Sequence, residues 1–244
     1  MKSLKKIRAE IRKNRDSITA KKAEIKKLSF EEEKSALFNV DRMRAFDKDA
    51  YKKLSEAAEA NAPTVEKLRR EIFAQEIETR ILYDNARAAL INEAYPVIFE
   101  ACKKYAGKPY GDKTSAAIYE EVKKAGYSFY FSARDSFSIV VIQELKDGYT
   151  RPDGIRAAAL ATDGAGHMTR FIDKENKINV LNVEIKAQSP YTENPAKKAR
   201  ELAKDIKKHE ADRARLEEAR AKLSAALPEG IKEPDYITSY YVSF

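Results

Sequence analysis

The sequence has one cysteine, two histidines, no tryptophan and eight glycines in 244 residues. The single cysteine, Cys102, excludes an internal disulfide and any zinc site built from several cysteines. Because the sequence has only two histidines and no nucleophile-elbow motif, we do not expect a covalent hydrolase. Because the chain lacks an apolar run of about 18 residues and a signal-peptide core after its basic start, we expect a soluble, cytoplasmic protein.

Glycine is also unevenly placed, since seven of the eight glycines lie between Gly107 and Gly166. Turn chemistry is therefore concentrated in the middle of the chain, and the flanks are rich in the strong helix formers Ala, Lys, Glu and Arg. This distribution predicts an α+β fold that is mostly helical, with coiled-coil arms at both ends and a central head built on an antiparallel β-meander.

Both arms show a seven-residue repeat of core positions, which is the signature of a coiled coil. Asn14 and Lys21 interrupt the first repeat, and His209, Arg213 and Arg220 interrupt the second. The core positions of the first arm are Leu4, Ile7, Ile11, Asn14, Ile18, Lys21, Ile25 and Leu28. Those of the second arm are Leu202, Ile206, His209, Arg213, Leu216, Arg220, Leu223 and Leu227.

The two repeats are similar in length, about 38 Å at 1.5 Å per residue, and polar near their middles. Laid antiparallel they bring these polar layers together, which predicts an intramolecular hairpin of the two arms. The alternative is a homodimer through parallel first arms, in which Asn14 pairs with its own copy.

Between the arms, the period changes from helical to extended. A continuous apolar run from Phe137 to Leu145 is suited to a central strand buried on both faces, whereas the alanines of Ile155–Thr162 leave helix as a rival. The connections are too short for helical crossovers, so an antiparallel meander is expected. The expected strands are Tyr127–Ala133, Phe137–Leu145, Ile155–Thr162, Met168–Ile172 and Ile178–Ala187.

These elements divide the chain into five regions. They are a basic coiled-coil arm (1–29), a helical region with a long helix expected to kink at Pro96 (30–106), an α+β head (107–191), a C-terminal coiled-coil arm (192–228) and a tail strand (229–244).

The net charge of +8 lies entirely on the first arm. Residues 1–29 hold eleven Lys or Arg against three acids, and the rest of the chain is balanced. A helix this basic attracts nucleic acid, an anionic membrane surface or an acidic protein, although lysines also serve to keep a coiled-coil exterior soluble. The candidate nucleic-acid-binding residues are Lys5, Arg8, Arg12, Lys13, Arg15, Lys22 and Lys26.

One stretch suggests chemistry. In a strand, Glu184 and Lys186 share one face, and this Glu-x-Lys with an upstream acid, Asp163 or Asp173, resembles the PD-(D/E)xK nuclease superfamily. The resemblance implies carboxylates that hold Mg²⁺ and a lysine that helps activate water. Neither aspartate follows a proline, which departs from the family pattern, and a cross-strand ion pair is the alternative.

The tail ends in the aromatic residues Tyr240, Tyr241 and Phe244, which either dock on the protein's own head or bind a partner. The sequence as a whole favours a non-enzymatic coiled-coil protein that binds nucleic acid or a nucleoprotein complex through its basic arm. No cofactor is expected. The alternatives are an adaptor or inhibitor of another protein machine, and a nuclease for which Mg²⁺ would be needed.

Overall fold

The computed structural model describes residues 1–39, 47–134, 137–146, 149–150, 155–162, 184–187 and 191–226, and single positions at 175, 177, 178 and 180. The chain divides into two units, Met1–Ala199 and Arg200–Phe244. The helices are α1 (Leu4–Leu28), α2 (Glu31–Asn39), α3 (Lys48–Ala60), α4 (Ala62–Lys103), α5 (Asp112–Lys124) and α6 (Pro195–Ala226). The strands are β1 (Tyr127–Arg134), β2 (Phe137–Lys146), β3 (Tyr149–Thr150), β4 (Arg156–Thr162) and β5 (Glu184–Ala187).

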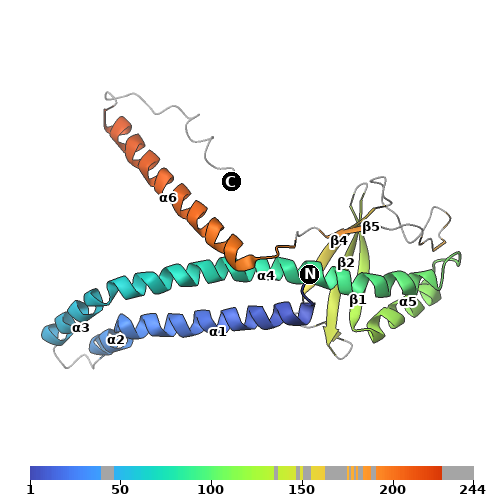
Figure 1. Cartoon of the computed structure of the whole chain (residues 1–244), viewed down its shortest axis with the longest axis horizontal. Helices are drawn as coiled ribbons and strands as arrows, with labels where there is room; N and C mark the ends of the chain where they lie inside the picture. Colours follow the sequence, from blue (N-terminus) through green and yellow to red (C-terminus); the bar gives the residue numbers. More distant parts are fainter. Residues whose placement is uncertain are drawn as a thin grey trace. The chain divides into compact units, whose positions relative to one another are not determined.

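The first unit is built around α1 and α4, which pack antiparallel along the length of α1 (Figure 1). The short helices α2 and α3 connect them at the end away from the sheet (Figure 1). The mostly helical α+β class and the antiparallel helical hairpin are confirmed, but the second helix of that hairpin is α4. The prediction that α1 pairs with residues 202–227 was therefore wrong about the partner.

The turn between α1 and α2 explains why the first repeat stops at Leu28. Ser29 ends α1 by donating its N–H to the Ile25 carbonyl at 2.9 Å, and Phe30 adopts a positive φ of 53°. A left-handed residue directly after a helix terminates it, at a cost of about 1–2 kcal/mol when that residue is not glycine. Three glutamates then open α2, where the helix dipole favours negative charge.

Local sequence signals begin the next two helices. The Asp47 carboxylate accepts the Ala50 N–H at 2.9 Å and begins α3, and α4 restarts at Ala62 with Pro63 in its first turn. A proline in the first helical turn lacks only an N–H that has no partner within the helix. Helix α4 then runs for 42 residues and is continuous through Pro96.

The sheet has the order β1-β2-β4-β5, with β3 paired to β2, and its pairs are antiparallel. The predicted meander is confirmed in β1, β2 and β4, and Ile155–Thr162 is strand rather than helix. Its alanines are small: Ala157 and Ala159 are buried where β4 packs on α4. The expected strand Met168–Ile172 lies outside the described residues.

The core of the first unit joins the end of α4 to the sheet and to α5. Side chains from all three layers are fully buried, and α1 adds three of its own. The largest fully buried apolar side chains are Ile7, Leu82, Leu90, Ile98, Val122, Val140 and Ile142. Helix α4 therefore belongs both to the helical hairpin and to the head.

Candidate nucleic-acid interface

The seam of α1 is covered by a matching repeat on α4. Leu4, Ile7 and Ile11 are buried, and the later core positions of α1 are half-buried. On α4 the repeat has the same alternation of three and four residues, which identifies α4 as an antiparallel coiled-coil partner. Its members are Val65, Leu68, Ile72, Gln75, Thr79, Leu82, Ala86 and Ala89.

The polar residues of this seam form a layer between the two helices. The Lys21 Nζ lies 2.7 Å from the Glu71 carboxylate and donates to the Gln75 Oε1 at 3.2 Å. The Gln75 Nε2 in turn donates to the Ser17 Oγ at 3.2 Å. Lys21 lowers the pKa of the Glu71 carboxyl, first through their hydrogen bond and then through its charge. These contacts fix the register of α1 on α4 because no one-turn shift preserves them.

One member of the seam is not satisfied. The Nδ2 of Asn14 is buried and has no hydrogen-bond partner among the described residues. A buried donor without an acceptor costs about 1–3 kcal/mol. The hairpin therefore carries a local defect one heptad before the Lys21 layer.

The start of α1 is tied to the head. The Leu4 N–H donates to the Glu93 carboxylate at 2.8 Å, which satisfies one of the free donors of the first helical turn. Arg8, which is half-buried, forms an ion pair with Glu144 of β2. Arg8 therefore serves the fold and is not available to a ligand.

The remaining bases of α1 lie on its outer side. We call basic face the set of exposed cations on α1 that form no ion pair with any residue the structure describes. Heptad positions b and c, opposite the seam, supply six of its members, and Arg15 extends it toward α4. The basic face consists of Lys5, Lys6, Arg12, Lys13, Arg15, Lys26 and Lys27.

The structure thus separates the seven predicted binding residues into two groups. Lys5, Arg12, Lys13, Arg15 and Lys26 belong to the basic face. The other two point to internal partners: Arg8 to Glu144, and Lys22 to Glu76 at 2.9 Å. Lys6 and Lys27 complete the surface and were missed, although both lie in the c column of the same repeat.

The length of the basic face is comparable to that of one turn of double-helical DNA. From Lys5 to Lys27 it extends about 33 Å along a single helix, close to the length of one turn of B-form DNA. Residues 1–29 contain no aromatic side chain, so this arm offers nothing on which an unpaired base could stack. The basic face can therefore act on an anionic partner through its positive charge alone.

The residues of the nuclease hypothesis are only partly described. Glu184 and Lys186 lie in β5, at one end of the sheet order, in register with Thr162 and Leu160. Asp163 and Asp173 lie outside the described residues. Within the part of the chain that the structure describes, no group of three or more Asp, Glu, His or Cys could hold a metal ion. The nuclease reading stays a prediction.

The remaining sequence candidates lie partly outside the described residues. Tyr240, Tyr241 and Phe244 lie outside the described residues. Cys102 is buried, and this burial raises the pKa of its thiol from 9.0 to about 12, which keeps it protonated and unreactive at neutral pH. Burial likewise raises the pKa of Tyr95 and of Tyr119 to about 12.

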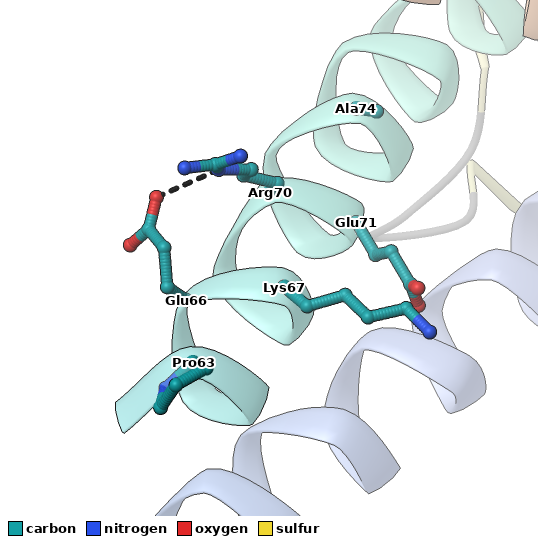
Figure 2. A pocket seen from close by; sticks show the side chains of 6 residues that line it. All are labelled: Pro63, Glu66, Lys67, Arg70, Glu71 and Ala74. Carbon is teal, nitrogen blue, oxygen red and sulfur yellow. Dashed lines mark hydrogen bonds and ion pairs between the residues drawn. The ribbon is translucent and has the colours of Figure 1, made fainter. Parts of the chain in front are cut away.

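A shallow groove of about 490 Å³ runs along the outer side of α4 (Figure 2). The Glu66 carboxylate meets the Arg70 guanidinium there at 2.8 Å, and Lys67 points toward Glu71 (Figure 2). Two acidic and two basic side chains line the groove, so their charges balance one another. Its lining is Pro63, Glu66, Lys67, Arg70, Glu71 and Ala74.

No family model matches the chain, and neither the curated proteins nor the solved structures give a match. Among the described residues, no helix is both long and apolar enough to cross a membrane.

Proposed function

We propose that this protein is a non-enzymatic coiled-coil interaction protein that binds nucleic acid, free or in a nucleoprotein complex, through the basic face of α1. The observation that carries the proposal is that one side of α1 packs on α4 and the other side remains exposed and basic. Its seam packs on α4, while Lys5, Arg12, Lys13 and Lys26 remain exposed and without an ion pair among the described residues.

The electrostatic argument is that this arm keeps its charge after folding. In the folded protein Arg8, Lys21 and Lys22 form ion pairs with acids of other elements. The cations of the basic face form no such pairs with described residues. Its acidic neighbours on α1 are few: residues 1–29 hold only three acids, of which Glu10 accepts an ion pair from Lys2 at 2.6 Å. The excess of positive charge is therefore concentrated on one side of one helix.

The length of the basic face favours a double-stranded ligand. Cations on a rigid helix follow a regular phosphate backbone over about one turn, and engaging about five phosphates predicts a slope of log K against log salt near −4.5. Affinity should then fall by about two to three orders of magnitude between about 50 mM and about 200 mM salt. Contacts of this kind carry no sequence preference.

The test is fluorescence anisotropy of labelled duplex and single-stranded DNA and RNA of about 24 nucleotides, titrated with the full-length protein at both salt concentrations. The binding variant replaces Lys5, Arg12, Lys13 and Lys26 by Glu. The matched control makes the same charge change on α6, at Lys204, Lys207, Lys208 and Arg215. We expect the first variant to lose binding and the second to retain most of it.

Two results would overturn the proposal. One is absence of binding by the unaltered protein at low salt. The other is equal loss in both variants, which would indicate a response to net charge alone. Including Mg²⁺ and checking the oligonucleotides for cleavage tests the nuclease alternative in the same samples, since cleavage lost in Glu184→Ala would support it.

The adaptor alternative is favoured by a separate observation on the other arm. Two large apolar side chains of the α6 repeat, Ile206 and Leu216, are 38% and 50% exposed. Exposed apolar residues at core positions of a coiled-coil repeat are typical of a surface that another helix covers.

A further inference from the structure

Within the second unit, the seam of the C-terminal arm is exposed where the structure describes its side chains. Along α6 from residue 204 onward the described side chains are exposed, apart from the half-buried Asp212. The apolar core positions Ile206 and Leu216 are among them, with Leu202 half-buried at the start of the repeat. A helix with an exposed seam of this length gains most of its stability from a partner, because isolated helices are marginal in water.

The charges of α6 are sorted around this seam. The e and g positions, which flank the core in a coiled coil, carry acids and no base from residue 203 onward: Asp205, Glu210, Asp212 and Glu217. The positions facing away from the seam carry mainly bases, with Glu201 and Glu218 as the exceptions. These bases are Arg200, Lys204, Lys207, Lys208, Arg215 and Lys222.

A second copy of α6 does not fit this pattern. In a parallel pair, g positions face e′ positions, so Asp205 meets Glu210 and Asp212 meets Glu217 of the other copy. In an antiparallel pair, g faces g′ and e faces e′, which again brings acid against acid. Like charges across the flanks of a coiled coil select against such pairing.

The acids that flank the seam of α6 therefore indicate a partner with bases at the matching positions. We propose that α6 is a docking helix for a partner helix that has an apolar seam flanked by lysines and arginines. Charge complementarity at the e and g positions determines which partner and which orientation a coiled coil accepts. The flanking acids are placed to meet such bases: Asp205 and Glu210 form no ion pair with a described residue.

The basic core positions of α6 refine this description. Arg213 pairs within its own helix to Glu217 at 2.9 Å, and both side chains are largely exposed. Polar side chains at core positions weaken a coiled coil but fix its register. The partner is thus expected to be apolar opposite Leu202, Ile206 and Leu216, and to accept hydrogen bonds opposite Arg213.

The experiment uses the full-length protein and two labelled peptides of about four heptads each, with identical cores of Ile and Leu that include one Asn as the hydrogen-bond acceptor for Arg213. One peptide carries Lys at its e and g positions, and the other carries Glu. We expect the Lys-flanked peptide to bind at least about tenfold more tightly by anisotropy, because opposite charges replace like charges along both flanks. A scrambled peptide with the Lys-flanked composition, which lacks a seam, controls for charge alone and should not bind.

Two variants of the protein make the test specific. Replacing Asp205, Glu210, Asp212 and Glu217 by Lys should reverse the preference in favour of the Glu-flanked peptide. Replacing Ile206 and Leu216 by Ser should abolish binding of both. Since these side chains lie on the exposed surface of a helix, both variants are expected to fold, which circular dichroism checks.

Several outcomes would overturn the proposal. They are equal affinity for the two peptides, no binding at about 1 mM peptide, and tight binding of the scrambled peptide. If the protein alone sediments as a dimer and the Ser variant sediments as a monomer, a second copy covers the seam. Amide exchange in α6 as slow as in α4, in the protein alone, would show that the seam is already covered.

Discussion

The two arms of this protein carry the same heptad repeat, but only one of them has a covered seam among the described residues. In α1 the core positions are mostly isoleucine and leucine, and α4 covers them. In α6 three central core positions are His209, Arg213 and Arg220, and the seam is exposed where the structure describes it. The comparison shows that a heptad repeat predicts that a helix has a partner but does not identify it. The partner of a helix is determined by the match of core volume, polar layers and flanking charge.

The largest expected difference between the arms is in stability. Ile7 is fully buried and Leu216 is 50% exposed. We expect Ile7→Ala to lower the free energy of unfolding by about 2–5 kcal/mol, through lost transfer energy and a residual cavity. Leu216→Ala, the matched control, should change it by less than about 0.5 kcal/mol. Urea unfolding measures both, and similar losses would contradict the distinction between the arms.

The linker that precedes the second arm gives the next largest effect. The buried amide of Asn85 accepts the Thr192 N–H at 2.6 Å and donates to the Thr192 carbonyl at 2.7 Å. Asn85→Ala leaves both backbone groups without partners, and we expect a loss of about 2–3 kcal/mol. Asn92→Ala, at an exposed position of α4, is the control. An unchanged unfolding midpoint in Asn85→Ala would show that water replaces the amide.

The polar defect of the first seam should respond in the opposite direction. Because the Asn14 Nδ2 is buried without a partner, Asn14→Leu should raise the free energy of unfolding by about 1 kcal/mol. The equivalent change on the second arm, His209→Leu, should leave the free energy of unfolding unchanged, because that side chain is exposed. Destabilisation by Asn14→Leu would mean that the site is too tight for a branched side chain.

The smallest effect concerns the pH dependence of the Lys21 layer. The folded-state pKa of Glu71 is lowered below its ordinary value of 4.5, so its stabilising contribution is fully present above that pH. The contribution is lost as pH falls through the folded pKa. We expect Glu71→Gln to reduce stability slightly at pH 7 and not at all at about pH 2. Unfolding curves at both values test this, with Glu217→Gln as the control on α6.

Much of the architecture follows from the sequence for physical reasons. The seam of α1, the Asp47 cap and the strand Phe137–Leu145 depend on local patterns of apolar and capping residues. The partner of α1 does not. Gln75 and Thr79 occupy core positions of α4, and Phe73, Ile77 and Ile81 form a second apolar stripe at steps of four, so the repeat on α4 is hard to separate from a drifting stripe.

The basic face illustrates the same division. Its location on one side of α1 follows from the repeat, because positions b and c point away from any seam. Which bases are consumed by folding cannot be read locally, since Arg8 pairs with an acid 136 residues away in sequence and Lys22 with one 54 residues away. Such pairs depend on the tertiary register, which the sequence does not specify by itself.

The continuity of α4 has a mechanical consequence. Its first half is zipped to α1 by the seam and the Lys21 layer, and its second half, through Ile98 and Cys102, is embedded in the core beneath the sheet. Because α4 stays helical through Pro96, a force applied near α3 is transmitted along one element to the sheet, and the weakest point of that path is Pro96, which removes a backbone hydrogen bond. Labels placed at Lys53 and Tyr110 should therefore report the same separation whether or not a ligand is bound to α1.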